Sequence, residues 1–188
     1  MQFSVTNYFS RVCEVIHRVN EEEVQFACEL ITRTIGAEKK VITCGNGGSA
    51  NAASHYITDW NKMYNLRHGR LFKGVSLCDN VGLITAFGND TGYENIFSGQ
   101  LRALGEKDDL LIVVSGSGNS PNVVSAINTA RELGLTSLAF VGYDGGTCGQ
   151  LADYKVHIPS YDMQFCEDIH LMLGHIVMKS ICDGEIYD

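Results

Sequence analysis

Residues Leu110-Leu-Ile-Val-Val114 form an unbroken apolar run, and the glycine- and serine-rich Ser115-Gly-Ser-Gly-Asn-Ser-Pro121 follows it at once. A short run without polar alternation is typical of a strand buried on both faces of a parallel sheet. Pro121 suits the first turn of a helix, where its missing N–H costs nothing, and Gly134 is placed to end that helix. This stretch therefore predicts a strand, a loop and a helix in succession.

The same alternation of strand and helix recurs on both sides of this unit. Helices are predicted to follow at residues 49–64, 80–87 and 162–182. The other short β-branched or apolar runs lie at residues 41–44, 74–77, 136–141 and 154–158. Elements that alternate in this way pair in parallel through right-handed crossovers. We predict a three-layer α/β sandwich on a five-stranded parallel sheet, of the flavodoxin- or Rossmann-like kind.

The first forty residues have a helical pattern instead. Apolar residues recur at steps of three and four from Val5 to Val19 and from Val24 to Ile35, and Gly36 is placed to end the second helix. No linker or repeat divides the chain, and 188 residues suit one core. We therefore predict a single domain over residues 1–188, with an N-terminal helical extension (1–36) and an α/β core (37–188).

Composition excludes several classes of protein. There are 14 Lys and Arg against 22 Asp and Glu, a net charge of −8, and no basic block interrupts it. A protein that reads nucleic-acid phosphates needs a basic stripe, so we expect no nucleic-acid partner. The apolar run at 110–114 is too short to cross a bilayer, so we expect no membrane partner.

The cysteines and the N-terminal residues indicate a cytoplasmic protein. The seven cysteines are scattered, and no two are spaced as Cys-x-x-Cys. This pattern is typical of reduced thiols in a cytoplasmic chain. The first residues lack the basic and apolar regions of a secretory signal, which agrees with that expectation.

Two predicted strand ends carry loops suited to an anion. Cys44-Gly-Asn-Gly-Gly-Ser-Ala50 lacks both the G-x-G-x-x-G pattern and the P-loop ending, yet it leads into a helix start rich in free N–H groups. The loop 115–120 adds three hydroxyl groups and an amide at another helix start. Hydroxyls and helix-end amides can hold a phosphate without Lys or Arg. A tight turn and an ordinary helix cap are the alternatives.

Titratable residues are spaced so that they share helix faces. His55 and Asp59 are four residues apart, and Glu167 and His175 are eight apart, whereas His170 is rotated away from Glu167. Two histidines and two carboxylates could form a divalent metal site or an acid/base set. Surface ion pairs or buried structural histidines would give the same spacing.

Taken together, these motifs resemble the sugar isomerase (SIS) fold and, within it, the phosphoheptose isomerase family. The likeness rests on the glycine turn with His55, on Gly88-Asn-Asp90, on the serine loop, and on Glu167-Asp-Ile-His170 with His175. The resemblance implies a homotetrameric aldose–ketose isomerase that interconverts sedoheptulose 7-phosphate and D-glycero-D-manno-heptose 7-phosphate for surface polysaccharide. It also implies that residues 1–36 serve oligomerisation and that the sugar phosphate is the partner.

The resemblance also implies roles for individual residues. Asp59 and His175 would be catalytic, as base and partner acid, and Zn²⁺ would be held by His55, Asp59, Glu167 and His175. The implied substrate-binding residues lie in the two loops, at one helix end and on the two helices. They are Asn46, Gly47, Gly48, Ser49, His55, Asp59, Asn89, Asp90, Ser115, Gly116, Ser117, Ser120, Glu167 and His175.

Three positions depart from the pattern of this family. The family commonly has Glu at Asp59, Gln at Glu167 and Thr at Gly116. Asp59 retains the carboxylate but withdraws it by about one methylene, whereas Glu167 replaces a neutral amide with an anion. These departures leave the identity of the sugar phosphate open, and a hexulose or pentose phosphate is an alternative substrate.

Some proteins with this fold are not enzymes. They sense a sugar phosphate or bind a replication initiator protein, and the initiator-binding type tends to lose the Gly-Gly-Ser turn and the terminal histidine. This chain has Gly47-Gly48-Ser49 and His175, which favours the isomerase.

Overall fold

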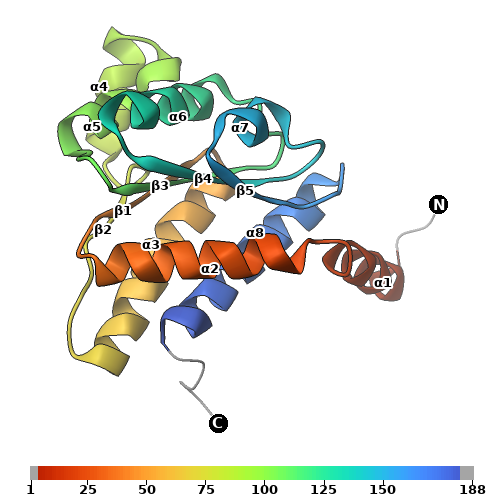
Figure 1. Ribbon diagram of the computed structural model, residues 1–188. Helices are drawn as coiled ribbons and strands as arrows, with labels where there is room; N and C mark the ends of the chain where they lie inside the picture. Colours follow the sequence, from red (N-terminus) through yellow and green to blue (C-terminus); the bar gives the residue numbers. More distant parts are fainter. Residues whose placement is uncertain (1–3, 183–188) are drawn as a thin grey trace.

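A parallel sheet of five strands runs through the middle of the molecule in the order β2-β1-β3-β4-β5 (Figure 1). The structure is a computed structural model that describes residues 4–182. In the register, Val41 of β1 lies opposite Leu110 of β3 and Gly74 of β2. The predicted fold class is confirmed. The strands are β1 (Val41–Gly45), β2 (Gly74–Ser76), β3 (Leu110–Ser115), β4 (Thr136–Val141) and β5 (Tyr154–His157).

Helices cover both faces of this sheet. Figure 1 shows α2, α3 and α8 on one face, α4 to α7 on the other, and α1 beyond the end of α2. The helices are α1 (Val5–Ile16), α2 (Glu21–Gly36), α3 (Gly48–His68), α4 (Val81–Asp90), α5 (Ser98–Leu104), α6 (Pro121–Leu133), α7 (Gly146–Leu151) and α8 (Met163–Ile181), with a 3-10 turn η1 (Tyr93–Asn95).

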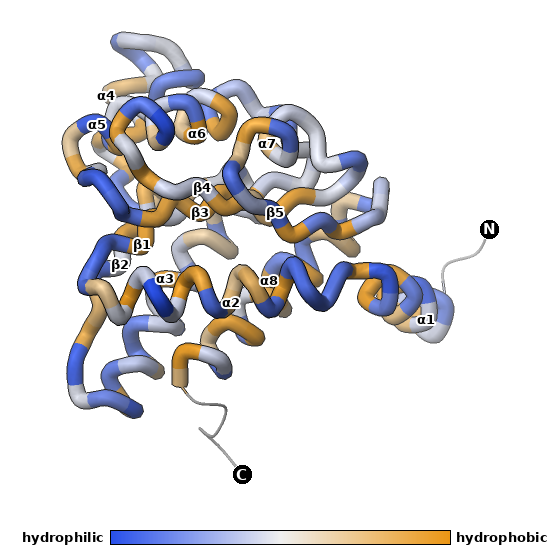
Figure 2. Tube along the Cα trace, viewed as in Figure 1, coloured by the Kyte–Doolittle hydropathy of each residue, from blue (hydrophilic) through white to orange (hydrophobic). Residues whose placement is uncertain are grey.

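Two apolar cores lie between these three layers. Successive strand residues point to opposite faces, so Leu110, Ile112 and Val114 pack beneath α2, α3 and α8, while Leu111 and Val113 pack toward α5 and α6. All five side chains are fully buried. In Figure 2, hydrophobic (orange) residues occur along the central strands and on the helices that cover them. This burial on both faces explains why β3 lacks polar alternation.

Helix ends follow local chemistry. The Asn20 side chain accepts a hydrogen bond from Glu22 N at the start of α2, and the Asp162 side chain accepts one from Gln164 N at the start of α8. Pro121 begins α6, and Gly134 ends it with a φ of 77°. The bounds of α6 and α8 match the predicted boundaries to within one residue, whereas α2 begins three residues before Val24, where its apolar pattern starts.

Several elements differ from the sequence-based prediction. Helix α3 extends to His68 rather than residue 64, because Met63 and Tyr64 continue its buried side and Gly69 ends it in a left-handed conformation. Helix α4 extends to Asp90 rather than residue 87. The short α5, α7 and η1 were not predicted, because segments of seven residues or fewer show no clear helical period.

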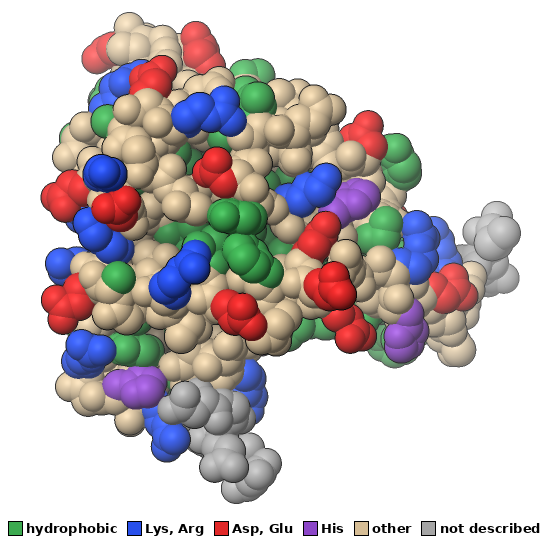
Figure 3. Space-filling view, viewed as in Figure 1, with side chains coloured by type: hydrophobic (Ala, Val, Ile, Leu, Met, Phe, Trp, Pro, Cys, Tyr) green, Lys and Arg blue, Asp and Glu red, His purple; other side chains and the backbone are tan. Residues whose placement is uncertain are grey.

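The distribution of charged side chains agrees with the absence of a basic block in the sequence. On the face shown in Figure 3, Lys and Arg side chains are interspersed with Asp and Glu. Among residues 4–182, no helix combines the length and apolarity needed to cross a lipid bilayer. The cysteines all lie within residues 4–182, and no disulfide bond joins any two of them.

Candidate functional site

The carboxyl ends of β1 and β3 enclose a cavity of about 240 Å³. Here the chain changes direction across the sheet, since β2 lies on one side of β1 and the later strands lie on the other. Loops diverge at such a point and leave a crevice for a ligand. The lining residues come from these two loops and the start of α8, and they are Asn46, Gly47, Gly48, Ser49, Val114, Ser115, Gly116, Ser117, Ser120, Met163 and Glu167.

The loop after β1 forms one wall and passes close to β3. A Cβ atom at Gly45 would lie 2.7 Å from the Ser49 carbonyl oxygen and 2.8 Å from the Val114 carbonyl oxygen, so this position requires glycine. The loop enters α3 through Gly47, which has a φ of 54°. Within residues 4–182, no side chain caps this helix start. Its first N–H groups can therefore bind an anion.

The loop after β3 forms the opposite wall and presents hydroxyl groups. Ser115 Oγ accepts a hydrogen bond from Gly118 N at 3.0 Å, and Ser117 Oγ accepts one from Asn119 N at 3.3 Å. Because each oxygen acts as an acceptor within the loop, its own O–H can donate to a ligand. This arrangement suits a phosphate group.

Helix α7 fixes the shape of that loop from behind. Cys148 N donates to the Gly118 carbonyl oxygen at 2.8 Å, and Thr147 donates through both N and Oγ1 to Asn119 Oδ1 at 2.9 Å. The loop is thus held by hydrogen bonds along its length rather than by one anchor. We expect its hydroxyl groups to stand in nearly the same places with or without a ligand.

Helix α8 closes the cavity with Met163 and Glu167. A side chain at Gly116 would overlap the Met163 sulfur, so Met163 occupies the space that the family's threonine would fill. The Glu167 carboxylate lies over Gly48, where any side chain would overlap it. Positions 116 and 167, where this chain differs from the pattern of the family, therefore both contact or form the cavity wall contributed by α8.

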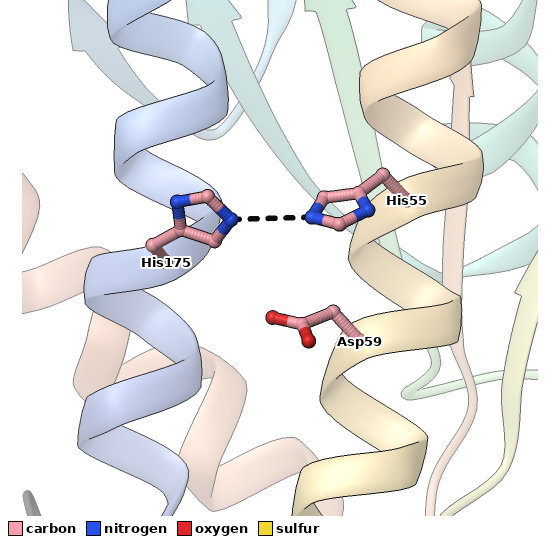
Figure 4. Close-up of side chains that lie close together, drawn as sticks. All are labelled: His55, Asp59 and His175. Carbon is pink, nitrogen blue, oxygen red and sulfur yellow. Dashed lines mark hydrogen bonds between the residues drawn. The ribbon is translucent and has the colours of Figure 1, made fainter. Parts of the chain in front are cut away.

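A second group of polar side chains lies farther along α3 and α8. His55 Nε2 and His175 Nε2 are 3.2 Å apart, and Asp59 lies below them on α3 (Figure 4). One ring must donate and the other accept across this distance. His55 and Asp59 are partly buried, whereas His175 is exposed. Two histidines in contact are not an ion pair, which argues against that alternative for this cluster.

This cluster fits a metal ion in its donor atoms and their spacing. One nitrogen of each histidine and one oxygen of Asp59 lie within 4.8 Å of one another. Tetrahedral Zn²⁺ with bonds of about 2.0–2.1 Å places its ligand atoms roughly 3.3 Å apart, which is close to the His55–His175 distance. Two imidazoles and a carboxylate are a common zinc set, with one position left for water or substrate.

Aromatic side chains of α3 fix its position against α8. Tyr56 OH donates to the His170 carbonyl oxygen at 2.5 Å, and Trp60 Nε1 donates to the Gly174 carbonyl oxygen at 2.7 Å. The two rings are stacked, with centroids 5.1 Å apart and planes at 6°. Both side chains are fully buried. Trp60 is therefore a packing residue, and together with Tyr56 it fixes the position of α8 along α3 beside His55.

The cavity and the cluster share one helix pair. Seven residues separate Gly48 from His55, which is about 10 Å along a helix axis. Eight residues separate Glu167 from His175, which is about 12 Å. Glu167 is consequently in the cavity wall and not among the three cluster ligands of the described chain.

Other expected residues lie elsewhere. Asn89 and Asp90 are exposed at the end of α4, where Asn89 Nδ2 donates to Asp90 Oδ1 at 2.7 Å, and neither lines the cavity. His170 is 1% exposed, and burial lowers its pKa to about 4. Neither ring nitrogen of His170 has a hydrogen-bond partner within residues 4–182. It is a neutral, buried residue.

Sequence reasoning missed Met163, Asn122 and Tyr93. Met163 contributes to the cavity wall, while Asn122 and Tyr93 hydrogen-bond to Asn46. The signal for Met163 was its place four residues before Glu167, on the same side of α8. The contacts of Asn122 and Tyr93 span 76 and 47 residues of sequence, and no local pattern indicates them.

Comparisons with known proteins agree with this geometry. A family model described as SIS domain matches residues 6–142. A phosphoheptose isomerase of Aliarcobacter butzleri is 34% identical over 189 residues, covering 99% of each chain. Solved phosphoheptose isomerase structures from Francisella tularensis and Neisseria gonorrhoeae superpose with TM-scores of 0.90 and 0.88 at 26% and 30% identity. They cover 95% of this chain and 96% and 97% of their own. These similarities confirm the resemblance predicted from the motifs.

Proposed function

Because the chain belongs to the phosphoheptose isomerase family of SIS-domain proteins, we propose that it interconverts sedoheptulose 7-phosphate and D-glycero-D-manno-heptose 7-phosphate. The observation that carries this proposal is the place of the His55–Asp59–His175 cluster. It lies about two helical turns from a hydroxyl-lined cavity, along the same pair of helices. An open-chain sugar phosphate is long enough to reach both.

The serine loop binds the phosphate in this proposal. Ser115, Ser117 and Ser120 offer hydroxyl donors, and the start of α3 adds backbone N–H groups. The Glu167 carboxylate repels a phosphate but accepts hydrogen bonds from hydroxyl groups. We therefore assign the phosphate to the serine side and the sugar hydroxyls to the Glu167 side. Asn46, Gly47, Gly48 and Gly116 complete this contact surface, and Asn89 and Asp90 are kept as proposed contacts.

The reaction moves a proton between C1 and C2 of the sugar. Asp59 takes a proton from C1 of the ketose, the C–H electron pair forms the C1=C2 bond, and the C2 carbonyl oxygen gains negative charge. His175 then delivers a proton to C2, while the hydroxyl proton of O1 passes to O2 and C1 becomes the aldehyde. Both side chains reach the space between α3 and α8 from opposite helices (Figure 4).

The proposed cofactor is Zn²⁺, held by His55, Asp59 and His175. The resemblance also implies Glu167 as a ligand, but its carboxylate lies over Gly48 in the cavity wall, about two turns of α8 from His175. When bound, the ion would polarise the carbonyl group and stabilise the oxyanion. His55 would then be a metal ligand only. Proton transfer would use those atoms of Asp59 and His175 that do not bind the ion.

We further propose that the chain works as a homotetramer in the cytoplasm and supplies heptose for surface polysaccharide. Exposed apolar side chains support the oligomer, because Val5 and Phe9 on α1 are 57% and 62% exposed, and Leu171, Met172 and Ile176 of α8 are about 40% exposed. The exposed position of His175 also favours a partner that covers the cluster.

Three experiments test this proposal: isotope labelling, two substitutions and capture of a protein partner. Incubation with a panel of pentulose, hexulose and heptulose phosphates in deuterated water should label C1 or C2 only with the heptulose phosphate. Asp59→Asn and His175→Ala should each lower turnover about 10³-fold, as for loss of a general acid or base. Near-normal turnover in both variants contradicts the assignment. Stoichiometric capture of a protein, with no exchange on any sugar phosphate, favours the non-catalytic alternative.

A further inference from the structure

Asn46 lines the cavity, but two residues outside the cavity hold its side chain. Asn46 Nδ2 donates to Asn122 Oδ1 at 2.9 Å, and Asn122 Nδ2 donates back to Asn46 Oδ1 at 2.8 Å. Tyr93 OH donates to the same Asn46 oxygen at 3.1 Å. Neither Asn122 nor Tyr93 is among the lining residues of the cavity.

The backbone of α6 determines which way both amides face. Val123 N donates to Asn122 Oδ1 at 3.1 Å, so the oxygen of Asn122 must lie on that side. If Asn122 were turned over, its NH₂ group would face this N–H, and two donors would oppose each other. The Asn122 NH₂ group is therefore directed at Asn46 and requires the oxygen of Asn46 opposite it.

This leaves the Asn46 side chain with one N–H group for a ligand. Its oxygen accepts two hydrogen bonds, from Asn122 and Tyr93, and one of its two N–H groups is used by Asn122. Within residues 4–182, the second N–H has no partner. Since Asn46 is part of the cavity wall, that N–H is the group it can offer to a ligand oxygen.

We propose that Asn122 and Tyr93 are positioning residues that make Asn46 a hydrogen-bond donor, not an acceptor, toward the sugar phosphate. The identity of the ligand rests on the proposed function, whereas the orientation of the amide does not. Asn122 is buried, at 1% exposure, and belongs to α6, so the pair also joins the loop after β1 to the helix that follows the serine loop. Tyr93 comes from η1 and is 59% exposed.

A double-mutant cycle tests the role of Tyr93 without a risk to folding. Tyr93→Phe should lower kcat/KM for sedoheptulose 7-phosphate about fivefold, as for loss of one neutral hydrogen bond. In an Asn46→Ala background the same change should have less than a roughly 1.5-fold effect, because Tyr93 acts through Asn46. Tyr154→Phe, on an exposed tyrosine of β5, is the matched control and should leave turnover unchanged. Equal losses in both backgrounds, or no loss in the wild-type chain, overturn the role of Tyr93.

Side-chain amide NMR tests the Asn122 pair in the wild-type chain. One Asn46 N–H proton should exchange slowly with solvent in the absence of ligand, and the other should shift when sedoheptulose 7-phosphate is added. Asn46→Asp assigns the two signals by their loss. Equal exchange of both protons overturns the positioning role, even if turnover is normal. Absence of turnover with unequal exchange contradicts the proposed function and leaves the amide orientation standing.

Discussion

The cavity at the strand ends and the His55–Asp59–His175 cluster are held by different parts of the chain. The cavity is shaped by backbone, because its loops pass so close to other carbonyl groups that positions 45 and 118 have no room for a side chain. The cluster is formed by three side chains on the surfaces of α3 and α8, which are regular helices at those points. We therefore expect the cavity loops to be disrupted by larger side chains. We expect the His55–Asp59–His175 cluster to be disrupted by the loss of a side-chain group.

This difference separates folding from chemistry. A substitution in the cavity loops alters backbone that also links β3 to α7, so it changes stability and binding together. A substitution in the cluster removes a donor or a proton carrier from a partly exposed surface, so it changes chemistry with little effect on folding. Four experiments measure how far that separation holds.

The largest effect is expected from a glycine of the serine loop. Gly118 has a φ of 67°, and a Cβ atom there would overlap the Gly145 carbonyl oxygen. Gly118→Ala should lower the free energy of unfolding by at least about 3 kcal/mol, since strain and a backbone clash add. The measurement is urea unfolding followed by circular dichroism.

Gly69→Ala is the matched control for that substitution. Gly69 has a φ of 69° with nothing within 4 Å of its missing Cβ, so it carries the conformational cost alone. We expect a loss of about 1 kcal/mol there. Equal losses at both positions would mean that the loop yields, and that backbone packing does not fix the cavity.

In the cluster, removal of a ligand should affect zinc rather than stability. His55→Ala should raise the zinc dissociation constant about 100-fold, because a direct ligand matters at least as much as a group that merely orients one. The melting temperature of the metal-free chain should change little. Calorimetric titration with zinc measures the constant, and His17→Ala, on an exposed histidine of the α1–α2 connection, is the control. A similar rise in both variants would place the ion elsewhere.

His170 lies on α8 between the two regions and should make stability depend on pH. Burial lowers its pKa to about 4 from an ordinary 6.5, so between these values the unfolded chain binds a proton that the folded chain does not. Stability therefore falls as the pH falls through this window, by about 2 kcal/mol between pH 7.5 and pH 5. His170→Gln should remove that part of the slope, whereas His17→Asn should retain it. An unchanged slope in His170→Gln assigns it to other groups.

The smallest effect is expected at Glu167, and it decides which region this residue serves. Removing a carboxylate from the phosphate cavity in Glu167→Gln should lower KM for the sugar phosphate roughly threefold, since one repulsion is lost. The zinc dissociation constant should change less than about threefold, because Glu167 is not among the three ligands that meet near His55. A rise like that of His55→Ala would make Glu167 the fourth ligand.

Much of the fold could be predicted because its central elements have simple patterns. Strand β3 and the Gly45–Gly48 turn can be predicted from a few consecutive residues. Pro121 and Gly134 likewise mark the ends of α6. The shared faces of His55 with Asp59 and of Glu167 with His175 also follow from helical period. Residue spacing predicts which side chains share a helix face, but not how far α8 is shifted along α3. For this reason Glu167 was expected beside His55, whereas it lies over Gly48.

The unpredicted features depend on contacts between distant parts of the chain. Tyr93 and Asn122 reach Asn46 only because η1 packs against α6 and α6 packs against β3. Likewise, the sequence indicates only that Gly116 lacks the threonine common in the family, while the structure shows the Met163 sulfur in that space. A short sequence pattern cannot show that Met163 fills the space beside Gly116, since residues 116 and 163 belong to different layers.

The two hydrogen bonds from Tyr56 and Trp60 to carbonyl oxygens on successive turns of α8 have a mechanical consequence. A slide of α8 along its axis by less than a full turn breaks both bonds and matches neither donor to a new acceptor. The two hydrogen bonds therefore hold the helix pair against any shift smaller than a whole turn. The spacing between the two imidazole rings is accordingly set when the chain folds, before any ion or sugar arrives.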